Sequence, residues 1–159
     1  MKSTPVLLAA TLSAIFAAPV YAGGAADGMT VIAPLIRMVP PKQPATGVFF
    51  VLKNSDDKDH KLVKVESAAA NVAEIHTHIN EGGMMKMRPV KDVEIKAKSE
   101  IMFRPGGLHV MLIGLKQSLQ EGENVTLKLI FEDDSSKEIT APVHKIQPMR
   151  SGADHMHMH

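Results

Sequence analysis

Residues 106–115 read GGLHVMLIGL, and this stretch has the pattern of a buried β-strand that is entered through a turn. The Gly-Gly pair is a turn signal, and the residues that follow it are mostly apolar. His109 and Met111 stand two positions apart in this run, so the pleat of a strand directs both side chains to the same face. A strand that presents an imidazole and a thioether side by side needs a chemical explanation.

The rest of the chain has a similar rhythm, with short apolar or alternating runs separated by turn residues about every ten positions. Helical periodicity is weak, although Leu115–Leu119 could form one helical turn. The pattern predicts an all-β, single-domain Greek-key sandwich or barrel. The expected strands are Met29–Arg37, Thr46–Lys53, Lys61–Ser67, Val72–Ile79, Met84–Val90, Glu94–Phe103, Leu108–Ile113, Asn124–Phe131 and Glu138–His144.

The first 22 residues have the composition of a signal peptide. Lys2 precedes an apolar run from Val6 to Ala18, and small residues at Val20 and Ala22 suit cleavage after Ala22. A membrane anchor is the alternative, but the run is shorter than the ~20 residues of a spanning helix. We therefore expect a signal peptide over 1–22, a folded domain over 23–145, a polar tail over 146–159, and a periplasmic protein.

Composition excludes several classes of function. Eighteen Lys and Arg residues nearly balance seventeen Asp and Glu residues, and no basic cluster interleaves with aromatic residues, so no nucleic-acid partner is expected. The chain has no cysteine, which excludes thiol nucleophiles, zinc–thiolate sites, iron–sulfur clusters and blue-copper sites. A nucleophile-elbow pattern is also missing, and we expect no enzyme. The eleven methionines and eight histidines are the distinctive feature that remains.

Four of these residues could converge on one ion. His76 lies in the strand-like AEIHTHI, and Met87 lies beyond a Gly-Gly turn in MMKMRPV. A hairpin would bring these two segments together, and a Greek-key return could place His109 and Met111 beside them. Imidazole is a borderline ligand and thioether a soft one, so the set favours Cu(I) over Zn(II). All four ligands are neutral, which stabilises Cu(I) against oxidation.

Each residue also has a structural alternative. A lone histidine on an apolar strand is more often a hydrogen-bonded core residue, and methionine usually fills gaps in a core. His78 shares a face with His76 and could be a fifth ligand, a support for a ligand or a rim residue, of which we rank the last two first. Met84 and Met85 are expected to pack against other side chains.

The order and spacing of the four residues resemble a known motif. His76, ten residues, Met87, twenty-one residues, then His109 and Met111 match H-x10-M-x21-H-x-M of the periplasmic copper chaperones of the PCu(A)C type. The segments AEIHTHINEGGMMKMRPV, RPGGLHVMLIGLK and LKLIFED are also similar to that family, and the resemblance spans about residues 31–143.

The resemblance implies a cupredoxin-like β-barrel that binds Cu(I) through His76, Met87, His109 and Met111. It further implies a monomer that passes copper to the CuA centre of cytochrome c oxidase, directly or through a Sco-type thiol protein. The alternative is a copper-buffering or resistance protein that has no dedicated recipient.

The chain ends in HMHMH, and some proteins of this type carry similar extensions. A nitrogen-rich end suits Cu(II), whereas a polar end without function is the alternative. We expect auxiliary ligands here: His155, Met156, His157, Met158 and His159.

Overall fold

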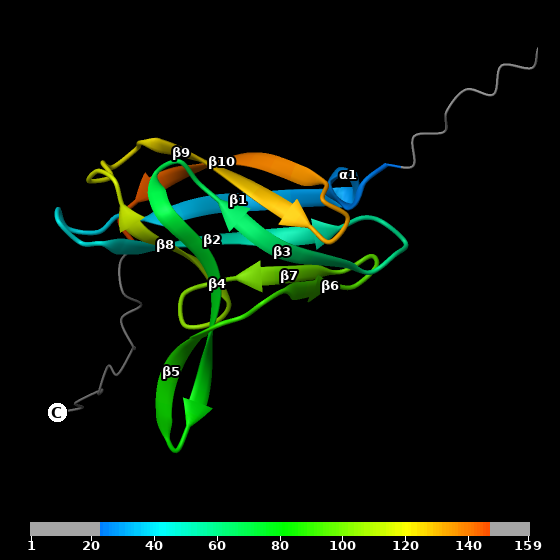
Figure 1. Ribbon diagram of the computed structural model, residues 1–159, viewed down its shortest axis with the longest axis horizontal. Helices are drawn as coiled ribbons and strands as arrows, with labels where there is room; N and C mark the ends of the chain where they lie inside the picture. Colours follow the sequence, from blue (N-terminus) through cyan, green and yellow to red (C-terminus); the bar gives the residue numbers. More distant parts are fainter. Residues whose placement is uncertain (1–22, 147–159) are drawn as a thin grey trace, which may run out of the picture.

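The computed structural model describes residues 23–146, in which ten strands and one short helix are found (Figure 1). The predicted signal peptide and residues 147–159 of the predicted tail lie outside this range. The elements are α1 (Ala25–Gly28), β1 (Met29–Arg37), β2 (Ala45–Asn54), β3 (His60–Glu66), β4 (Ala70–Glu81), β5 (Met84–Pro89), β6 (Val93–Ile95), β7 (Glu100–Phe103), β8 (His109–Leu115), β9 (Asn124–Phe131) and β10 (Ser136–His144).

The strands form one sheet that folds over on itself into a sandwich. Their order is β5-β4-β8-β2-β1-β10-β9-β3-β6, and β7 pairs with the end of β2. Strands β1 and β10 pair in parallel and join the two halves, whereas the other pairs are antiparallel. We call the half that contains β5, β4, β8, β2 and β1 the front sheet, and the half that contains β10, β9, β3 and β6 the back sheet. The prediction of an all-β sandwich is confirmed.

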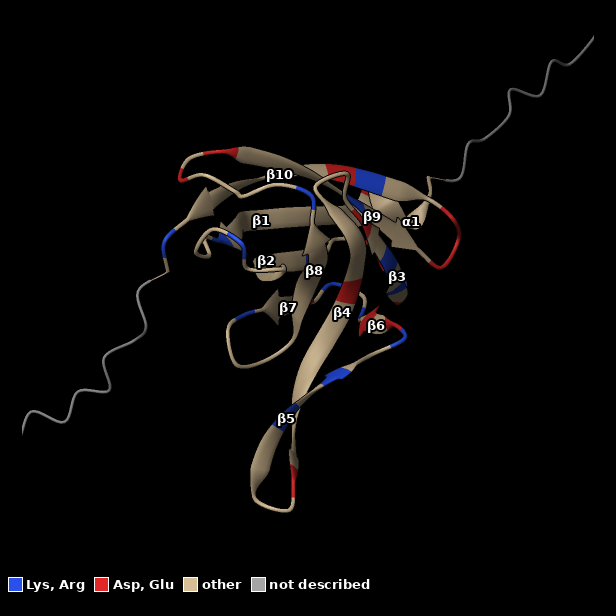
Figure 2. Ribbon diagram, turned by 60° about the vertical axis from the view of Figure 1, so that its left-hand side comes forward, with Lys and Arg blue, Asp and Glu red and all other residues tan. Residues whose placement is uncertain are grey.

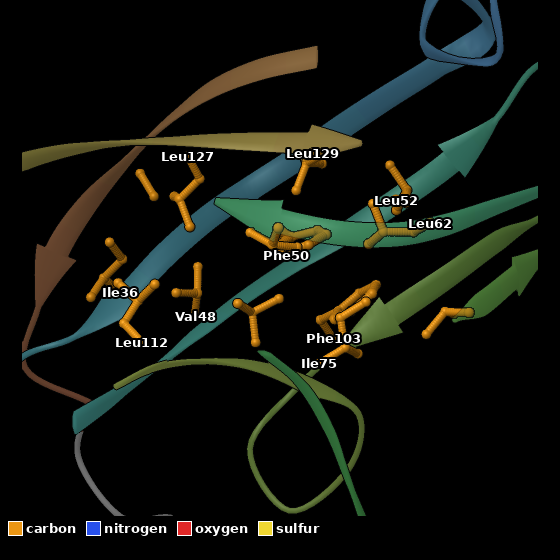
Figure 3. Packing of buried hydrophobic residues seen from close by; sticks show 14 of the residues in the cluster. Ile36, Val48, Phe50, Leu52, Leu62, Ile75, Phe103, Leu112, Leu127 and Leu129 are labelled. Atoms are coloured by element: carbon orange, nitrogen blue, oxygen red, sulfur yellow. The ribbon is translucent and has the colours of Figure 1, made fainter. Parts of the chain in front are cut away.

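The hydrophobic core lies between the two sheets. Strand β9 buries every second side chain, and Figure 3 shows its Leu127 and Leu129 opposite Val48 and Phe50 of β2. In β8 the core residues are Val110 and Leu112, both fully buried. Because strand side chains alternate, His109 and Met111 project from the front sheet on the side away from this core.

Most predicted strands are present, with ends shifted by two residues at most. The exception is Glu94–Phe103, which is split into β6 and β7 by a tight turn. Lys98 has a left-handed backbone, with φ of 56°, and the Ser99 N–H donates to the carbonyl of Lys96 at 3.2 Å. The apolar alternation continues through this turn, so the prediction of one strand was wrong.

The helical turn that Leu115–Leu119 could form is also absent. Leu115 ends β8, and the chain then bends so that the N–H of Lys116 donates to the carbonyl of Ala69 at 3.0 Å. Leu119 is buried without a helix. The only helix among residues 23–146 is the four-residue α1, and no helix in that range has the length and apolar character needed to cross a membrane.

The β4–β5 hairpin extends beyond the sandwich as a two-stranded arm (Figure 1). On one face of the arm, Glu81 pairs with Arg88 at 3.0 Å and with Lys86 at 2.8 Å, and these charges mark the arm in Figure 2. The register places Met87 opposite His78 on the other face. Cross-strand ion pairs of this kind help to hold the register that positions Met87.

Gly114 allows β8 to fit between its neighbours. It has φ of 70°, its N–H donates to the carbonyl of Pro44 at 2.7 Å, and an added Cβ would lie 2.6 Å from Nδ2 of Asn71. Gly122 is a matched comparison, because it has φ of 81° but an added Cβ would meet nothing within 4 Å.

We predict that Gly114→Ala destabilises the protein more than Gly122→Ala. Both variants force a side chain into the left-handed region, at a cost of about 1–2 kcal/mol. Gly114→Ala must in addition displace Asn71, which adds about 1 kcal/mol or more. Urea unfolding of both variants measures the difference, and equal losses would show that Asn71 moves aside freely.

Candidate metal centre

A cavity of about 300 Å³ lies on the front sheet, on the side away from the core. Its donor side chains come from three strands: His78 of β4, Met87 of β5, and His109 and Met111 of β8. The loop between β7 and β8 forms one wall, through Pro105 and Gly106. Strand β2 and the end of β1 form the opposite wall.

Strand register brings the predicted ligands together. His76 of β4 lies directly opposite His109 of β8, and Glu74 lies opposite Met111. Residues paired in this way have Cβ atoms about 4.5–5.5 Å apart and point to the same face. His76 and His109 are separated by thirty-two residues in the chain, but the pairing of β4 with β8 makes them direct cross-strand neighbours.

His109 is held with one nitrogen free. His109 is 3% exposed, and its Nδ1 lies 2.7 Å from the carbonyl oxygen of Gly107. A carbonyl can only accept, so Nδ1 carries the hydrogen and Nε2 keeps its lone pair. The β7–β8 loop supplies this acceptor because Gly106, with φ of 77°, allows the chain to turn there.

His76 presents the opposite nitrogen. Its Nε2 donates to Oε2 of Glu74 at 2.8 Å, which leaves the lone pair on Nδ1. That Nδ1 is buried and has no hydrogen-bond partner. Buried polar atoms are nearly always paired, so this atom calls for a partner that the protein chain does not supply. A carboxylate that orients an imidazole from behind is a common support of metal-binding histidines.

The two rings are close enough to share an ion. Their centres lie 6.0 Å apart, although His76 itself is not among the residues that line the cavity. The structure therefore brings together all four predicted ligands: Met87, His109 and Met111 line the cavity, and His76 lies beside His109. His78, expected at the rim or in support of a ligand, also lies in the wall.

Methionine side chains near the site differ in exposure. Met87 is 44% exposed, and Met111 is partly buried. Met84 and Met85 are each 62% exposed near the tip of the β4–β5 arm, so the prediction that they pack against other side chains was wrong. The hairpin extends beyond the sandwich, and no core lies next to them.

An aromatic residue that sequence reasoning missed closes the cavity on the β2 side. Phe49 is buried, and its ring centre lies 6.4 Å from that of His109. The Arg37 guanidinium lies over the Phe49 ring at 5.4 Å. Gly47 makes room for this ring, because an added Cβ would lie 2.9 Å from it. Glu74 was missed as well, although it shares the face of His76 by the period of two.

Burial sets the protonation of His109. Desolvation lowers its pKa below the ordinary value of 6.5, and the nearby His78, His76 and Arg37 lower it further, although the carbonyl of Gly107 opposes the shift. The imidazole is therefore neutral at pH 7, which is the form that binds a metal.

Comparison with known proteins places the chain in a family. The family described as "Putative lipoprotein LpqE-like" matches residues 29–143. The chain belongs to the LpqE-like family. One relative of this LpqE-like protein, named "Putative lipoprotein Lxx21020", comes from Leifsonia xyli subsp. xyli (strain CTCB07). The two are 29% identical over 154 residues, which cover 89% of this chain and 92% of the relative.

Solved structures agree with this assignment. The solution structure of CuI-DR1885 from Deinococcus radiodurans is 34% identical, covers 74% of this chain and 76% of its own, and superimposes with a TM-score of 0.56. The copper-bound PCuAC domain from PmoF2 is 21% identical, covers 79% of this chain and 97% of its own, and has a TM-score of 0.64. The resemblance to the PCu(A)C proteins and the cupredoxin-like β fold are confirmed.

The hydrogen bonds predict the tautomers of two histidines in this LpqE-like protein. We expect His109 to carry its hydrogen on Nδ1 and His76 on Nε2, which long-range ¹H–¹⁵N correlation spectra distinguish. Glu74→Ala removes the acceptor, so His76 should become a mixture of tautomers while His109 is unchanged. Glu100→Ala, in β7, is the control and should alter neither ring; a mixed His76 in the unmodified protein would contradict the assignment.

Stability should fall in acid because of His109. The unfolded chain has the ordinary pKa of 6.5, whereas the folded protein has a lower one, so the unfolded state binds protons more readily between the two values. The free energy of unfolding therefore falls as the pH drops from 6.5 toward the folded pKa, and this contribution is complete above 6.5. Chemical unfolding at pH 7.5 and pH 5.5 tests this, and His109→Gln should show a smaller decrease; an equal decrease would contradict it.

Proposed function

We propose that this protein is an exported copper chaperone that binds Cu(I) through His76, Met87, His109 and Met111. The observation that carries the proposal is the buried, unpartnered Nδ1 of His76, which lies across a strand pair from His109. The free Nε2 of His109 and the two thioethers belong to the same face of the front sheet. Two imidazoles and two thioethers supply four neutral donors.

The donor chemistry favours Cu(I). Zn(II) sites use thiolate or carboxylate in addition to imidazole, whereas soft thioethers favour Cu(I). The family relationship supports the same metal, because two of the similar solved structures are described as CuI-DR1885 and as a copper-bound PCuAC domain. The donor chemistry and the similar structures therefore both support copper as the metal.

The position of the site suits transfer of the ion rather than permanent storage. The cavity lies on an outer face, and Met87 is 44% exposed on a hairpin that extends from the sandwich. A partner's ligands can replace Met87 before the ion leaves His109. We propose the CuA centre of cytochrome c oxidase, or a Sco-type thiol protein that supplies it, as the recipient.

The proposed location is the periplasm. The pattern over residues 1–22 supports a cleavable signal peptide, and the relatives named as lipoproteins suggest export. We propose a copper-binding domain over 23–145 and a tail over 146–159. The histidines and methionines of HMHMH, residues 155–159, would be auxiliary ligands for Cu(II), which prefers nitrogen.

We predict that Met87→Leu and Met111→Leu each weaken Cu(I) binding by about tenfold or more, which is about 1.4 kcal/mol. Leucine keeps the apolar volume and removes the sulfur, so the fold should be retained. Competition with a chromogenic Cu(I) chelator measures the affinity. Met102→Leu, at an exposed position of β7, is the control; if all three variants bind like the unmodified protein, copper is bound elsewhere.

A further inference from the structure

His78 has the position of a ligand in the metal cavity. It lines the cavity together with Met87, His109 and Met111, and the register sets it directly opposite Met87. Its ring centre lies 5.3 Å from that of His109, closer than the 6.0 Å that separates His76 from His109. The H-x10-M-x21-H-x-M spacing does not include this residue.

Ring separation shows which pairs of histidines could bind one ion. With a metal–nitrogen bond of about 2.0 Å, each ring centre lies about 3.2 Å from the metal. Two rings on one ion then have centres about 4.5–6.4 Å apart for bond angles of about 90–180°. The pair of His78 and His109 and the pair of His76 and His109 both fall within this range.

The three histidines do not form a single site. Among residues 23–146, no three side chains of His, Asp or Glu are grouped so that they could hold one metal ion. In this arrangement an ion held by His109 can meet His76 or His78, and not both at once.

The ring of His78 is held by a weaker hydrogen bond than that of His109. Its Nδ1 lies 3.4 Å from the carbonyl oxygen of Gly107, the same atom that accepts from His109 at 2.7 Å. A separation of 3.4 Å is long for a hydrogen bond, so this contact holds the ring weakly. His76, in contrast, is fixed by its bond to Glu74 at 2.8 Å.

We propose that His78 is a copper ligand that alternates with His76 as the second imidazole of the site. This inference rests on the proposed function and adds a second binding position to it. In the inner position the ion is held by His76 and His109. In the outer position it is held by His78 and His109, next to the exposed Met87.

Alternation provides a route for release in small steps. Exchange of His76 for His78 moves the ion along β4 toward the arm while His109 and the thioethers remain available. The bond to His76 breaks and a bond to His78 forms, so the ion has the same number of ligands before and after the step and ends beside Met87. Ligand exchange with a partner then begins from the outer position.

A double-mutant cycle on the full chain tests the proposal. The variants are His76→Ala, His78→Ala and the combination of both, with His144→Ala, an exposed histidine of β10, as the control. Affinity for Cu(I) is measured by competition with bathocuproine disulfonate. The histidines at 155, 157 and 159 are replaced by Ala in every protein of the series, so that the tail does not contribute.

If the two histidines alternate, each single variant retains the other ligand and loses less than about threefold in affinity, because only one of two binding positions is removed. The double variant has no second imidazole and should lose about a hundredfold or more, far beyond the sum of the single effects. If the double variant binds like His76→Ala alone, His78 is not a ligand and the proposal is wrong. In that case the proposed function still stands if Cu(I) binding depends on Met87 and Met111.

A second measurement does not depend on the variants folding. Cu(I) is added to the chain in which only the histidines at 155, 157 and 159 are replaced by Ala. The ¹⁵N resonance of His78 Nε2 should then shift, as should the ring-nitrogen resonances of His76 and His109. A shift confined to His76 and His109 would overturn the alternation. No shift in any of the three would overturn both the alternation and the proposed function.

Discussion

The pairing of β4 with β8 is the constraint on which the metal centre depends. His76 faces His109 across this pair, and β5 then adds Met87 through the hairpin. A slip of one residue in either strand would turn the donors of that strand toward the core. The register is fixed by burial, because Val110 and Leu112 are fully buried on the other face of β8.

The alternation of side chains along the strands keeps the metal centre separate from the hydrophobic core. The four proposed ligands lie on the outer face of the front sheet, where binding or loss of an ion would leave the packing of the two sheets unchanged. His109 is nevertheless shielded, since Phe49 and the β7–β8 loop cover it. His109 is neutral and buried, whereas Met87 is exposed, so the site has a protected side and an open side.

Hydrogen bonds prepare the two imidazoles in different ways. The carbonyl of Gly107 fixes the Nδ1 hydrogen of His109, and the carboxylate of Glu74 fixes the Nε2 hydrogen of His76. Each bond leaves the other nitrogen with its lone pair. The protein thereby sets the orientation of the rings before any ion arrives, which lowers the entropy lost on binding.

The sequence by itself determined the all-β fold and most strands, because a period of two is a local signal, and a rare spacing of His and Met predicted the four residues that the strand register brings together. It did not reveal the turn at Lys98, where apolar alternation continues through a change of direction. Only the tertiary structure decided that Met84 and Met85 are exposed, that Gly107 and Glu74 orient the rings, and that His78 lies in the cavity wall. These depend on strand register and loop closure, which join residues far apart in the chain and leave no pattern in a short segment.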